Sequence, residues 1–173
     1  MATRNAPITL RFARREDVGL VLEFIRELAS YEGLLHEVVA TPALLEEHLF
    51  GPRRAAEVLL AEVGGEPAAF ALFFPNFSTF RGRPGLYLED LYVRPQYRGH
   101  GLGLQLMRAL AHLALQRGCA RFEWWVLDWN APAIAFYRSL GAVGMQDWTV
   151  QRLDGEALQK LAAAFDPAAL PRD

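Results

Sequence analysis

Hydrophobic and polar residues alternate in several short stretches, a pattern typical of strands with one buried face. Residues 8–13 show this alternation. Residues 57–63 and 67–77 are two further predicted strands, and Gly64-Gly65 between them indicates a hairpin. Residues 86–93 and 121–127 are also predicted to be strands, and residues 143–153 are expected to supply one or two more. The predicted strands are therefore spread along most of the chain.

Apolar residues spaced three and four apart predict helices between these strands. Long apolar stripes cover residues 16–31 and 103–117. Thr41 and Asn130 each precede a stretch with an early proline, so both are expected to cap helices, which run to about residues 50 and 140. The resulting order is β-α-α-β-β-β-α-β-α-β, with a last helix at 155–165. This order indicates an α/β fold, a mixed sheet with helices on both faces in three layers.

A chain of 173 residues is suited to one domain, which we expect over 1–173 with a core from about 8 to 164. Hydrophobic residues make up 52% and charged residues 22%, as in soluble globular proteins. No apolar run reaches the roughly 18 residues of a membrane span, and no secretory signal is visible. A cytoplasmic protein is therefore expected, and the net charge of −2 gives no basic field for nucleic acid.

The residue types present argue against several kinds of chemistry. Lys160 is the only lysine, which disfavours Schiff-base chemistry and a P-loop lysine. Cys119 is the only cysteine, so an intrachain disulfide and a cysteine-based metal cluster are excluded. The four histidines are scattered along the sequence, so no metal site is expected.

A strand, a basic turn and a glycine-rich helix start follow one another in residues 86–103. The turn reads Arg98-Gly99-His100-Gly101-Leu102-Gly103. Glycines let a ligand approach bare backbone N–H groups, and a helix N-terminus favours phosphate. The spacing is neither that of a dinucleotide-binding fingerprint nor that of a P-loop. The turn therefore predicts an anion site, although a glycine-rich turn without a ligand is the alternative.

Two adjacent carboxylates, Glu89 and Asp90, lie in the strand that leads into this turn. In a regular strand adjacent side chains face opposite sides, so the two are not expected to form a paired-carboxylate site. Asp90 is expected to turn away from the chemistry of Glu89. An ion pair with arginine is the structural alternative for either residue.

Asn130 and Tyr137 are seven residues apart, so they share one face of the predicted helix. A capping asparagine and a buried tyrosine would account for both without any catalytic role.

Together these segments resemble the GCN5-related N-acetyltransferase (GNAT) superfamily. The family signature Arg/Gln-x-x-Gly-x-Gly/Ala is matched by Arg98, Gly101 and Gly103. ELASYE, YLEDLYV, YRGHGLG and VLDWNAPAIAFYRSLGA resemble the spermidine/spermine N-acetyltransferase branch, in the same order. The resemblance covers roughly residues 10–162.

The resemblance implies a mostly antiparallel GNAT-like sheet with one splayed parallel strand pair. It implies acetyl-CoA as cosubstrate and no metal. The strand backbone at the splay would pair with the pantetheine arm, the turn would hold the pyrophosphate, and Asn130 would also bind the pantetheine arm. The expected cofactor-binding residues are Leu91, Tyr92, Val93, Arg98, Gly99, His100, Gly101, Leu102, Gly103, Leu104, Asn130 and Ala133.

For catalysis, the resemblance implies that Glu89 holds or deprotonates the amine and that Tyr137 acts as the general acid. Tyr31 and Glu32, together with Glu89, would line the acceptor site. The implied reaction is direct attack of a primary amine on acetyl-CoA in a ternary complex, and a homodimer is expected. No nucleic acid or membrane partner is implied.

The acceptor is the least determined part of this interpretation. The segment after Glu32 has fewer acids than expected for a polycation site, which favours a shorter or less cationic amine such as a diamine or a thialysine-like amino acid, while a polyamine stays open. The aromatic stretch at 73–80 could line the acceptor pocket or a dimer contact. A protein N-terminal or lysine acetyltransferase and a non-catalytic acyl-CoA-binding module are the competing functions.

Overall fold

The computed structural model describes residues 6–167 of the chain. These residues form two compact units that divide between Trp125 and Val126. The first unit contains the sheet and most of the buried residues, and the second contains two helices. We describe each unit by itself.

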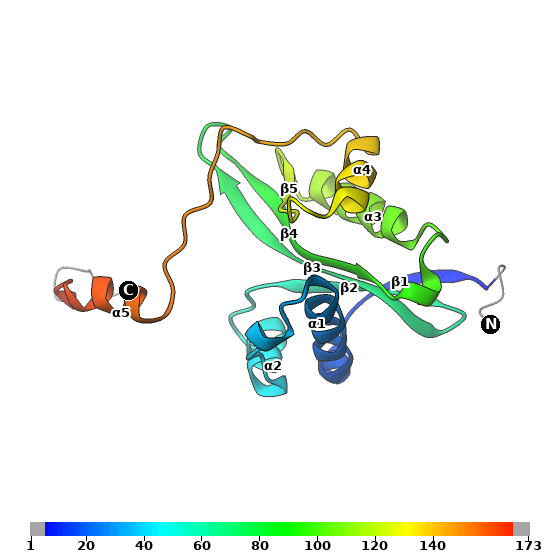
Figure 1. Ribbon diagram of the computed structural model, residues 1–173, viewed down its shortest axis with the longest axis horizontal. Helices are drawn as coiled ribbons and strands as arrows, with labels where there is room; N and C mark the ends of the chain where they lie inside the picture. Colours follow the sequence, from blue (N-terminus) through cyan, green and yellow to red (C-terminus); the bar gives the residue numbers. More distant parts are fainter. Residues whose placement is uncertain (1–5, 168–173) are drawn as a thin grey trace. The chain divides into compact units, whose positions relative to one another are not determined.

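The sheet of the first unit has five strands in the order β1-β2-β3-β4-β5 (Figure 1). Neighbours are antiparallel except for β4 and β5, which are parallel. The strands are β1 (Ile8–Phe12), β2 (Glu57–Val63), β3 (Glu66–Ser78), β4 (Arg83–Val93) and β5 (Phe122–Trp124). The predicted hairpin at Gly64-Gly65 is confirmed. β4 begins three residues earlier than expected, and β5 is shorter than the predicted 121–127.

Helices cover both faces of this sheet. Helices α1 (Val18–Glu32) and α2 (Pro42–Phe50) lie on one side, and α3 (Leu102–Gln116) lies on the other (Figure 1). Short 3-10 turns occupy Arg15–Asp17, Leu35–Glu37 and Pro95–Tyr97. The Thr41 hydroxyl accepts a hydrogen bond from the Leu44 N–H at 3.3 Å, which confirms the predicted cap of α2. The three-layer arrangement is therefore confirmed.

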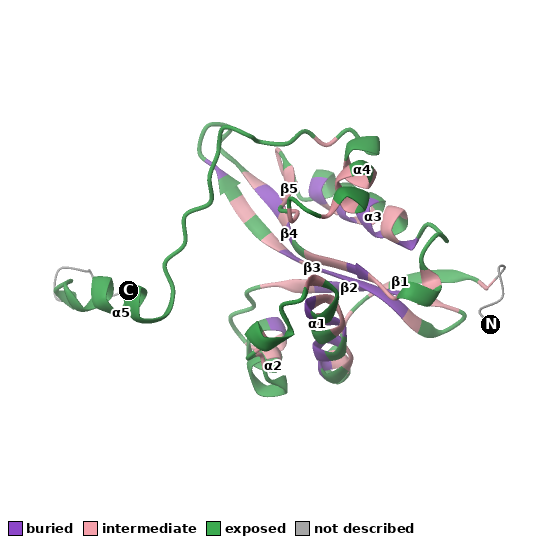
Figure 2. Cartoon of the chain, in the orientation of Figure 1, coloured by how far each residue is buried: buried purple, intermediate pink, exposed green. Residues whose placement is uncertain are grey.

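The core is divided between the two faces of the sheet (Figure 2). On the α1 side, Phe24 stacks on Phe70 with ring centroids 5.2 Å apart and meets Tyr92 edge-on at 6.4 Å. On the α3 side, Leu106 and Leu110 from the apolar stripe of α3 are completely buried. The hydrophobic periodicity in the sequence therefore identified the buried faces of both long helices.

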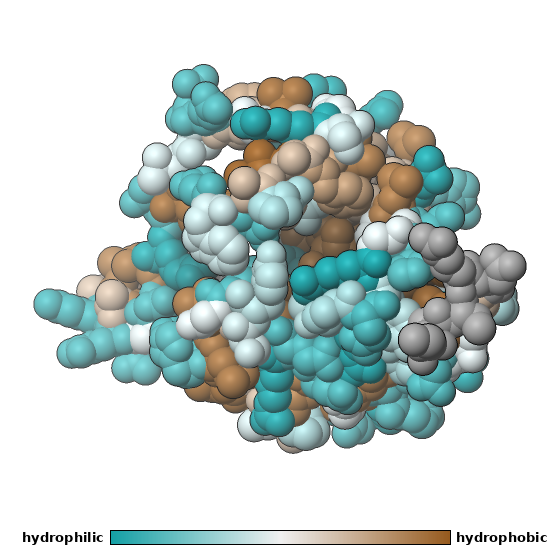
Figure 3. Space-filling view, turned by 45° about the vertical axis from the view of Figure 1, so that its right-hand side comes forward, coloured by the Kyte–Doolittle hydropathy of each residue, from teal (hydrophilic) through white to brown (hydrophobic). Residues whose placement is uncertain are grey.

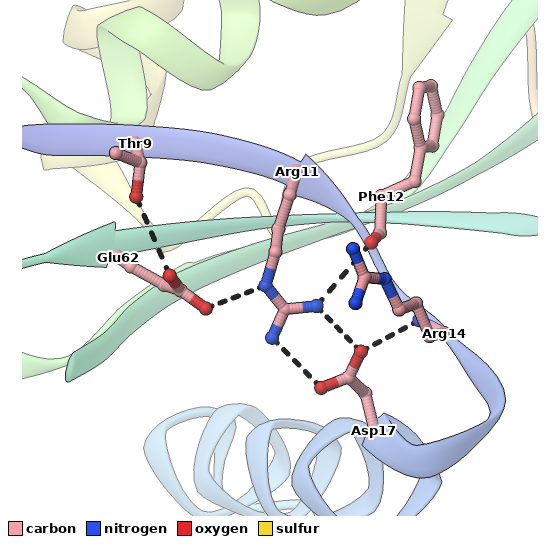
Figure 4. A network of polar contacts seen from close by, with 6 residues as sticks. All are labelled: Thr9, Arg11, Phe12, Arg14, Asp17 and Glu62. Carbon is pink, nitrogen blue, oxygen red and sulfur yellow. Dashed lines mark hydrogen bonds and ion pairs between the residues drawn. The ribbon is translucent and has the colours of Figure 1, made fainter. Parts of the chain in front are cut away.

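Arg11 connects the edge of the sheet to the start of α1 (Figure 4). Its guanidinium donates to both oxygens of Asp17, at 2.7 and 2.9 Å, and to Glu62 Oε1 on β2 at 2.7 Å. Asp17 also accepts from the Arg14 N–H at 2.7 Å. The hydrogen bond from Arg11 holds the pKa of Asp17 below its ordinary value. This network fixes the point at which β1 turns into α1.

The second unit contains α4 (Ala131–Ser139) and α5 (Gly155–Ala163). The prediction of one or two strands at 143–153 is wrong, because the structure describes no strand between residues 126 and 167. A strand needs an edge to pair with, and this segment has no such edge within its own unit. Its apolar side chains are exposed instead, namely Val143, Met145, Trp148, Val150 and Leu153.

Apolar side chains are also exposed elsewhere on the molecule. The surface view shows hydrophobic residues interspersed among hydrophilic ones (Figure 3). Phe77 and Phe80 lie at and just after the end of β3, and both are exposed.

Candidate functional site

The glycine turn leads from β4 into α3, as the sequence predicted. Gly99 and Gly101 have φ angles of 76° and 81°, in the left-handed region that favours glycine. Gly101 is the residue before the first turn of α3, and no side chain caps that turn in the part of the chain that the structure describes. The first N–H groups of α3 are therefore oriented for an anion such as a pyrophosphate.

Arg98 fixes the turn to the strand and to α1. Its Nε donates to the Val93 carbonyl at 2.9 Å, and its guanidinium lies over the rings of Tyr31 and Tyr92 at 5.0 and 5.6 Å. The contacts observed for Arg98 are thus made within the protein. They connect a predicted cofactor residue, Arg98, with a predicted acceptor residue, Tyr31.

The parallel strand pair separates early. Residues 86–88 of β4 pair with residues 122–124 of β5, and β5 then ends while β4 continues to Val93. Leu91, Tyr92 and Val93 pair with β3 on their other side. Within residues 6–125 no strand faces them on the β5 side. Their backbone groups on that side can therefore serve an extended ligand such as the pantetheine arm.

A β-bulge interrupts β4 at Glu89. Leu88 pairs with Phe73 and Asp90 pairs with Leu72, so Glu89 has no partner on β3. The extra residue shifts the alternation, and Tyr87 and Asp90 consequently lie on the same face of the sheet, the one covered by α1. The expectation that alternation turns Asp90 away assumed a regular strand, and the bulge at Glu89 interrupts that regularity.

Three carboxylates, those of Glu32, Glu89 and Asp90, lie close enough to interact electrostatically. Burial raises the pKa of Asp90 to about 7, with further contributions from the negative charges of Glu89 and Glu32. Burial also raises the pKa of Glu32. Because no arginine or lysine contributes to either shift, the surroundings of these carboxylates favour a cation, such as an ammonium group.

The predicted acceptor residues at the end of α1 differ in their surroundings. Glu32 is partly buried and interacts electrostatically with Asp90, whereas Tyr31 is 45% exposed beneath Arg98. The structure therefore brings Glu32 close to the acidic part of β4, and sequence reasoning missed that Asp90 belongs to the same group. Regular alternation gave no signal for it.

Arg94 holds α1 against the end of β4. Its guanidinium donates to Glu23 at 2.6 Å and to Glu27 at 2.8 Å, and a further donor reaches the Pro67 carbonyl at 3.0 Å. The guanidinium also lies 4.6 Å from the ring centroid of Phe24. These contacts fix the helix whose last turn carries Tyr31 and Glu32.

Aromatic and polar side chains continue the same face beyond the acids; the sequence had indicated those at 73–80 but not Tyr87, Glu123 or Trp125. The Tyr87 ring lies 5.1 Å from Phe74 and 5.8 Å from Trp125. Burial, followed by the charges of Glu89 and Glu123, raises the pKa of Tyr87. Asn76 donates to Glu123 at 3.0 Å, but its own Oδ1 is buried without a hydrogen-bond partner among the described residues. Such an unpaired acceptor typically costs about 1–3 kcal/mol.

The remaining predicted residues belong to the second unit. Asn130 caps α4, where its Oδ1 accepts from the Ala133 N–H at 3.3 Å, so the predicted cap is confirmed. Tyr137 is partly buried, with its ring 5.3 Å from that of Phe136. Between residues 6 and 167 no cluster of three metal-ligating side chains is found, and no helix is long and apolar enough to span a membrane.

Comparisons with known proteins agree with these features. The acetyltransferase (GNAT) family model matches residues 23–142. A thialysine N-epsilon-acetyltransferase from Sus scrofa is 38% identical over 168 residues, 91% of this chain and 98% of that protein. A spermidine/spermine N(1)-acetyltransferase-like protein 1 from Homo sapiens is 30% identical over 163 residues, 88% of this chain and 23% of that protein.

Among solved structures, an integron cassette protein from the mobile metagenome of V. cholerae is similar with a TM-score of 0.76. It is 27% identical in sequence, and the match covers 91% of this chain and 98% of that chain. The predicted GNAT-like sheet with one parallel pair is therefore confirmed. This protein belongs to the GNAT family of acetyltransferases, whose members use acetyl-CoA as cosubstrate.

Proposed function

We propose that the protein transfers the acetyl group of acetyl-CoA to a primary amine of a small molecule. The observation that carries this proposal is the cluster of three carboxylates, from Glu32, Glu89 and Asp90. This cluster lies where β4 separates from β5. A cationic acceptor at these acids would lie close to the strand backbone that suits a pantetheine arm. Polyamines, diamines and thialysine-like amino acids all fit, and the similarity to a thialysine acetyltransferase supports the last class.

Acetyl-CoA would be held by the residues that the family signature implies. The N–H groups from Gly99 to Leu104 would bind the pyrophosphate, and the backbone of residues 91–93 would bind the pantetheine arm. Asn130 and Ala133 would contribute from α4. The open backbone of β4 and the left-handed glycines of the turn support these assignments.

Proton transfer is the main chemical task, because an aliphatic amine with a pKa of about 10.4 is neutral in only roughly one molecule in 10³ at pH 7. Glu89 would accept the proton, directly or through water, as the amine attacks the thioester in a ternary complex. Tyr137 would donate a proton to the departing thiolate. General acid–base catalysis of this kind typically contributes about 10²–10⁴-fold.

Two variants test these roles. Glu89→Gln and Tyr137→Phe should each lower kcat by about tenfold or more, because each removes one proton-transfer group. Calorimetry should show that acetyl-CoA still binds both variants with the Kd of the wild type. The matched control is Glu66→Gln, which removes an exposed carboxylate at the start of β3 and should keep full activity. Full activity in both test variants would contradict the assigned roles.

A substrate panel tests the acceptor class. Thiol release from acetyl-CoA should be measured with diamines, polyamines, diamino acids and lysine-containing peptides. Turnover of peptides alone would favour a protein acetyltransferase. Tight CoA binding with no turnover of any amine would favour a non-catalytic acyl-CoA-binding module.

We also propose that residues 1–173 act as one acetyltransferase domain and that the protein forms a homodimer in the cytoplasm. The exposed apolar side chains between residues 143 and 165 support a further contact surface. Acetyl-CoA as cosubstrate supports a location inside the cell. Light scattering coupled to size-exclusion chromatography should give a mass near twice the 19.4 kDa of the chain, and a mass of one chain would contradict the dimer.

A further inference from the structure

Three polar residues from three neighbouring strands form a group at the far end of the acidic face. Arg121 precedes β5, Glu123 lies in β5, and Asn76 lies in β3. Arg121 Nε lies 2.6 Å from Glu123 Oε2, and Asn76 Nδ2 donates to the same oxygen at 3.0 Å. Glu123 pairs with Tyr87 on β4, so the group shares the face of Tyr87 and Asp90.

This group retains hydrogen-bonding capacity that its own members do not use. Both donors converge on Oε2 of Glu123, and the structure describes no hydrogen bond to Oε1 within residues 6–167. The terminal nitrogens of Arg121 make one long contact, from Nη2 to the Phe77 carbonyl at 3.5 Å. Both side chains are accessible, at 38% for Arg121 and 37% for Glu123. A carboxylate oxygen and a guanidinium edge are therefore presented side by side.

The hydrogen bond from Asn76 orients Glu123 but costs Asn76 the pairing of its own amide oxygen among the described residues. Asn76 directs its amide nitrogen to Glu123, which leaves its Oδ1 buried against Gly85 with no hydrogen-bond partner among residues 6–167. A β-carbon at Gly85 would collide with that oxygen. An exposed ion pair contributes little to folding stability. Stability therefore gives little reason for this arrangement, and a ligand that uses the oriented pair would give one.

The distance to the acids matches a particular class of acceptor. Tyr87, the strand partner of Glu123, precedes Glu89 and Asp90 by two and three residues, which is about 7–10 Å along a strand. The nitrogens of an extended α,ω-diamino acid with three or four methylene groups are separated by roughly 6–8 Å, given bonds of about 1.5 Å. Between the two ends, the rings of Tyr87, Phe74 and Trp125 offer an apolar surface for methylene groups.

We propose that Arg121 and Glu123 bind the α-carboxylate and the α-ammonium group of an α,ω-diamino acid whose ω-amine is acetylated beside Glu89. This inference rests on the proposed function and assigns the residues that would select amino acids among its acceptor classes. A carboxylate pairs with a guanidinium through two parallel hydrogen bonds, which the free edge of Arg121 can supply. A linear diamine lacks the carboxylate and leaves Arg121 without this interaction, so the site selects amino acids over diamines.

The test compares lysine and ornithine with their decarboxylated counterparts, cadaverine and putrescine. The wild type should have a kcat/KM at least about tenfold higher for the amino acids, the range expected for one hydrogen bond to a charged group. Arg121→Met should lower kcat/KM for the amino acids by about 10- to 100-fold, mainly through KM, so the ratio of kcat/KM for amino acids to that for diamines should fall by at least the same factor. Arg108→Met, an exposed arginine on α3, is the matched control and should change neither.

A second measurement uses only the wild type and so does not depend on the folding of a variant. The methyl esters of lysine and ornithine keep both amines but lose the carboxylate charge, and their KM should rise by about tenfold or more. Equal kcat/KM for amino acids, esters and diamines would overturn the inference while the proposed function stands. Absence of acetylation of every amine, despite acetyl-CoA binding, would overturn both.

Discussion

Asp90 offers a direct test of the acidic face through the pH dependence of stability. Burial and the charges of Glu89 and Glu32 raise its pKa from 3.8 to about 7. The folded protein therefore keeps a proton that the unfolded chain releases as the pH rises from about 4 to 7. Below pH 3.8 the carboxyl group is neutral in both states and costs nothing. Above pH 7 its ionisation in the folded state carries the full cost.

The difference between about 7 and 3.8 is about 3 pKa units. At about 1.4 kcal/mol per unit, the full cost is about 4 kcal/mol. About 2–3 kcal/mol of this develops between pH 5 and pH 8, because part of the cost is already present at pH 5. Asp90→Asn has the same shape and no titrating proton. It should therefore stabilise the protein more at pH 8 than at pH 5, by about 2–3 kcal/mol.

Urea unfolding followed by tryptophan fluorescence at pH 5, 6, 7 and 8 would measure this difference. Glu66→Gln removes an exposed carboxylate at the start of β3 and serves as the control, with a pH dependence parallel to that of the wild type. Glu89→Gln should shift the loss of stability caused by ionisation of Asp90 to lower pH, because it removes one of the charges that raise the pKa of Asp90. Parallel curves for the wild type and Asp90→Asn would refute the reasoning.

Three further substitutions test the core, the anchor of α1 and the turn. Phe70→Ala removes a completely buried ring stacked on Phe24 and should cost about 3–5 kcal/mol in urea unfolding; a loss below 1 kcal/mol would contradict the packing. Arg94→Met leaves Glu23 and Glu27 without their cation and should cost about 2–3 kcal/mol, whereas Arg108→Met should cost almost nothing. Gly101→Ala strains a left-handed residue by about 1–2 kcal/mol, so the KM for acetyl-CoA should rise while that for the amine is unchanged. Equal effects on both KM values would argue against a separate cofactor role for the turn.

Local sequence signals predicted most of the elements because each signal acts within a few residues. Thr41 caps α2 and Asn130 caps α4 through hydrogen bonds to backbone groups three residues away. Gly99 and Gly101 adopt left-handed conformations, in keeping with the tight turn that the glycines predicted. The predicted strands at 8–13, 57–63 and 67–77 agree with β1, β2 and β3 to within one residue at each end.

The contacts that define the acidic face could not be predicted in this way, because they join residues far apart in sequence. Asn76 and Glu123 are 47 residues apart, and Arg94 and Glu27 are 67 apart. Nothing in the local composition around Glu89 indicates a bulge, which depends on how β4 is paired with β3. The strand prediction for residues 143–153 was wrong for the opposite reason. The apolar residues of this segment recur every two or three positions and so suggested a strand, but such a pattern does not supply a neighbouring strand edge for pairing.

The bulge at Glu89 also limits how this enzyme can change during evolution. Deleting one residue between Leu88 and Asp90 would restore regular pairing with β3 and turn one half of β4 to the other face. Either the aromatic end at Tyr87 or the acidic end at Asp90 would then leave the α1 side. A new acceptor preference can therefore arise by substitution along this strand, whereas insertions and deletions within it should be eliminated by selection.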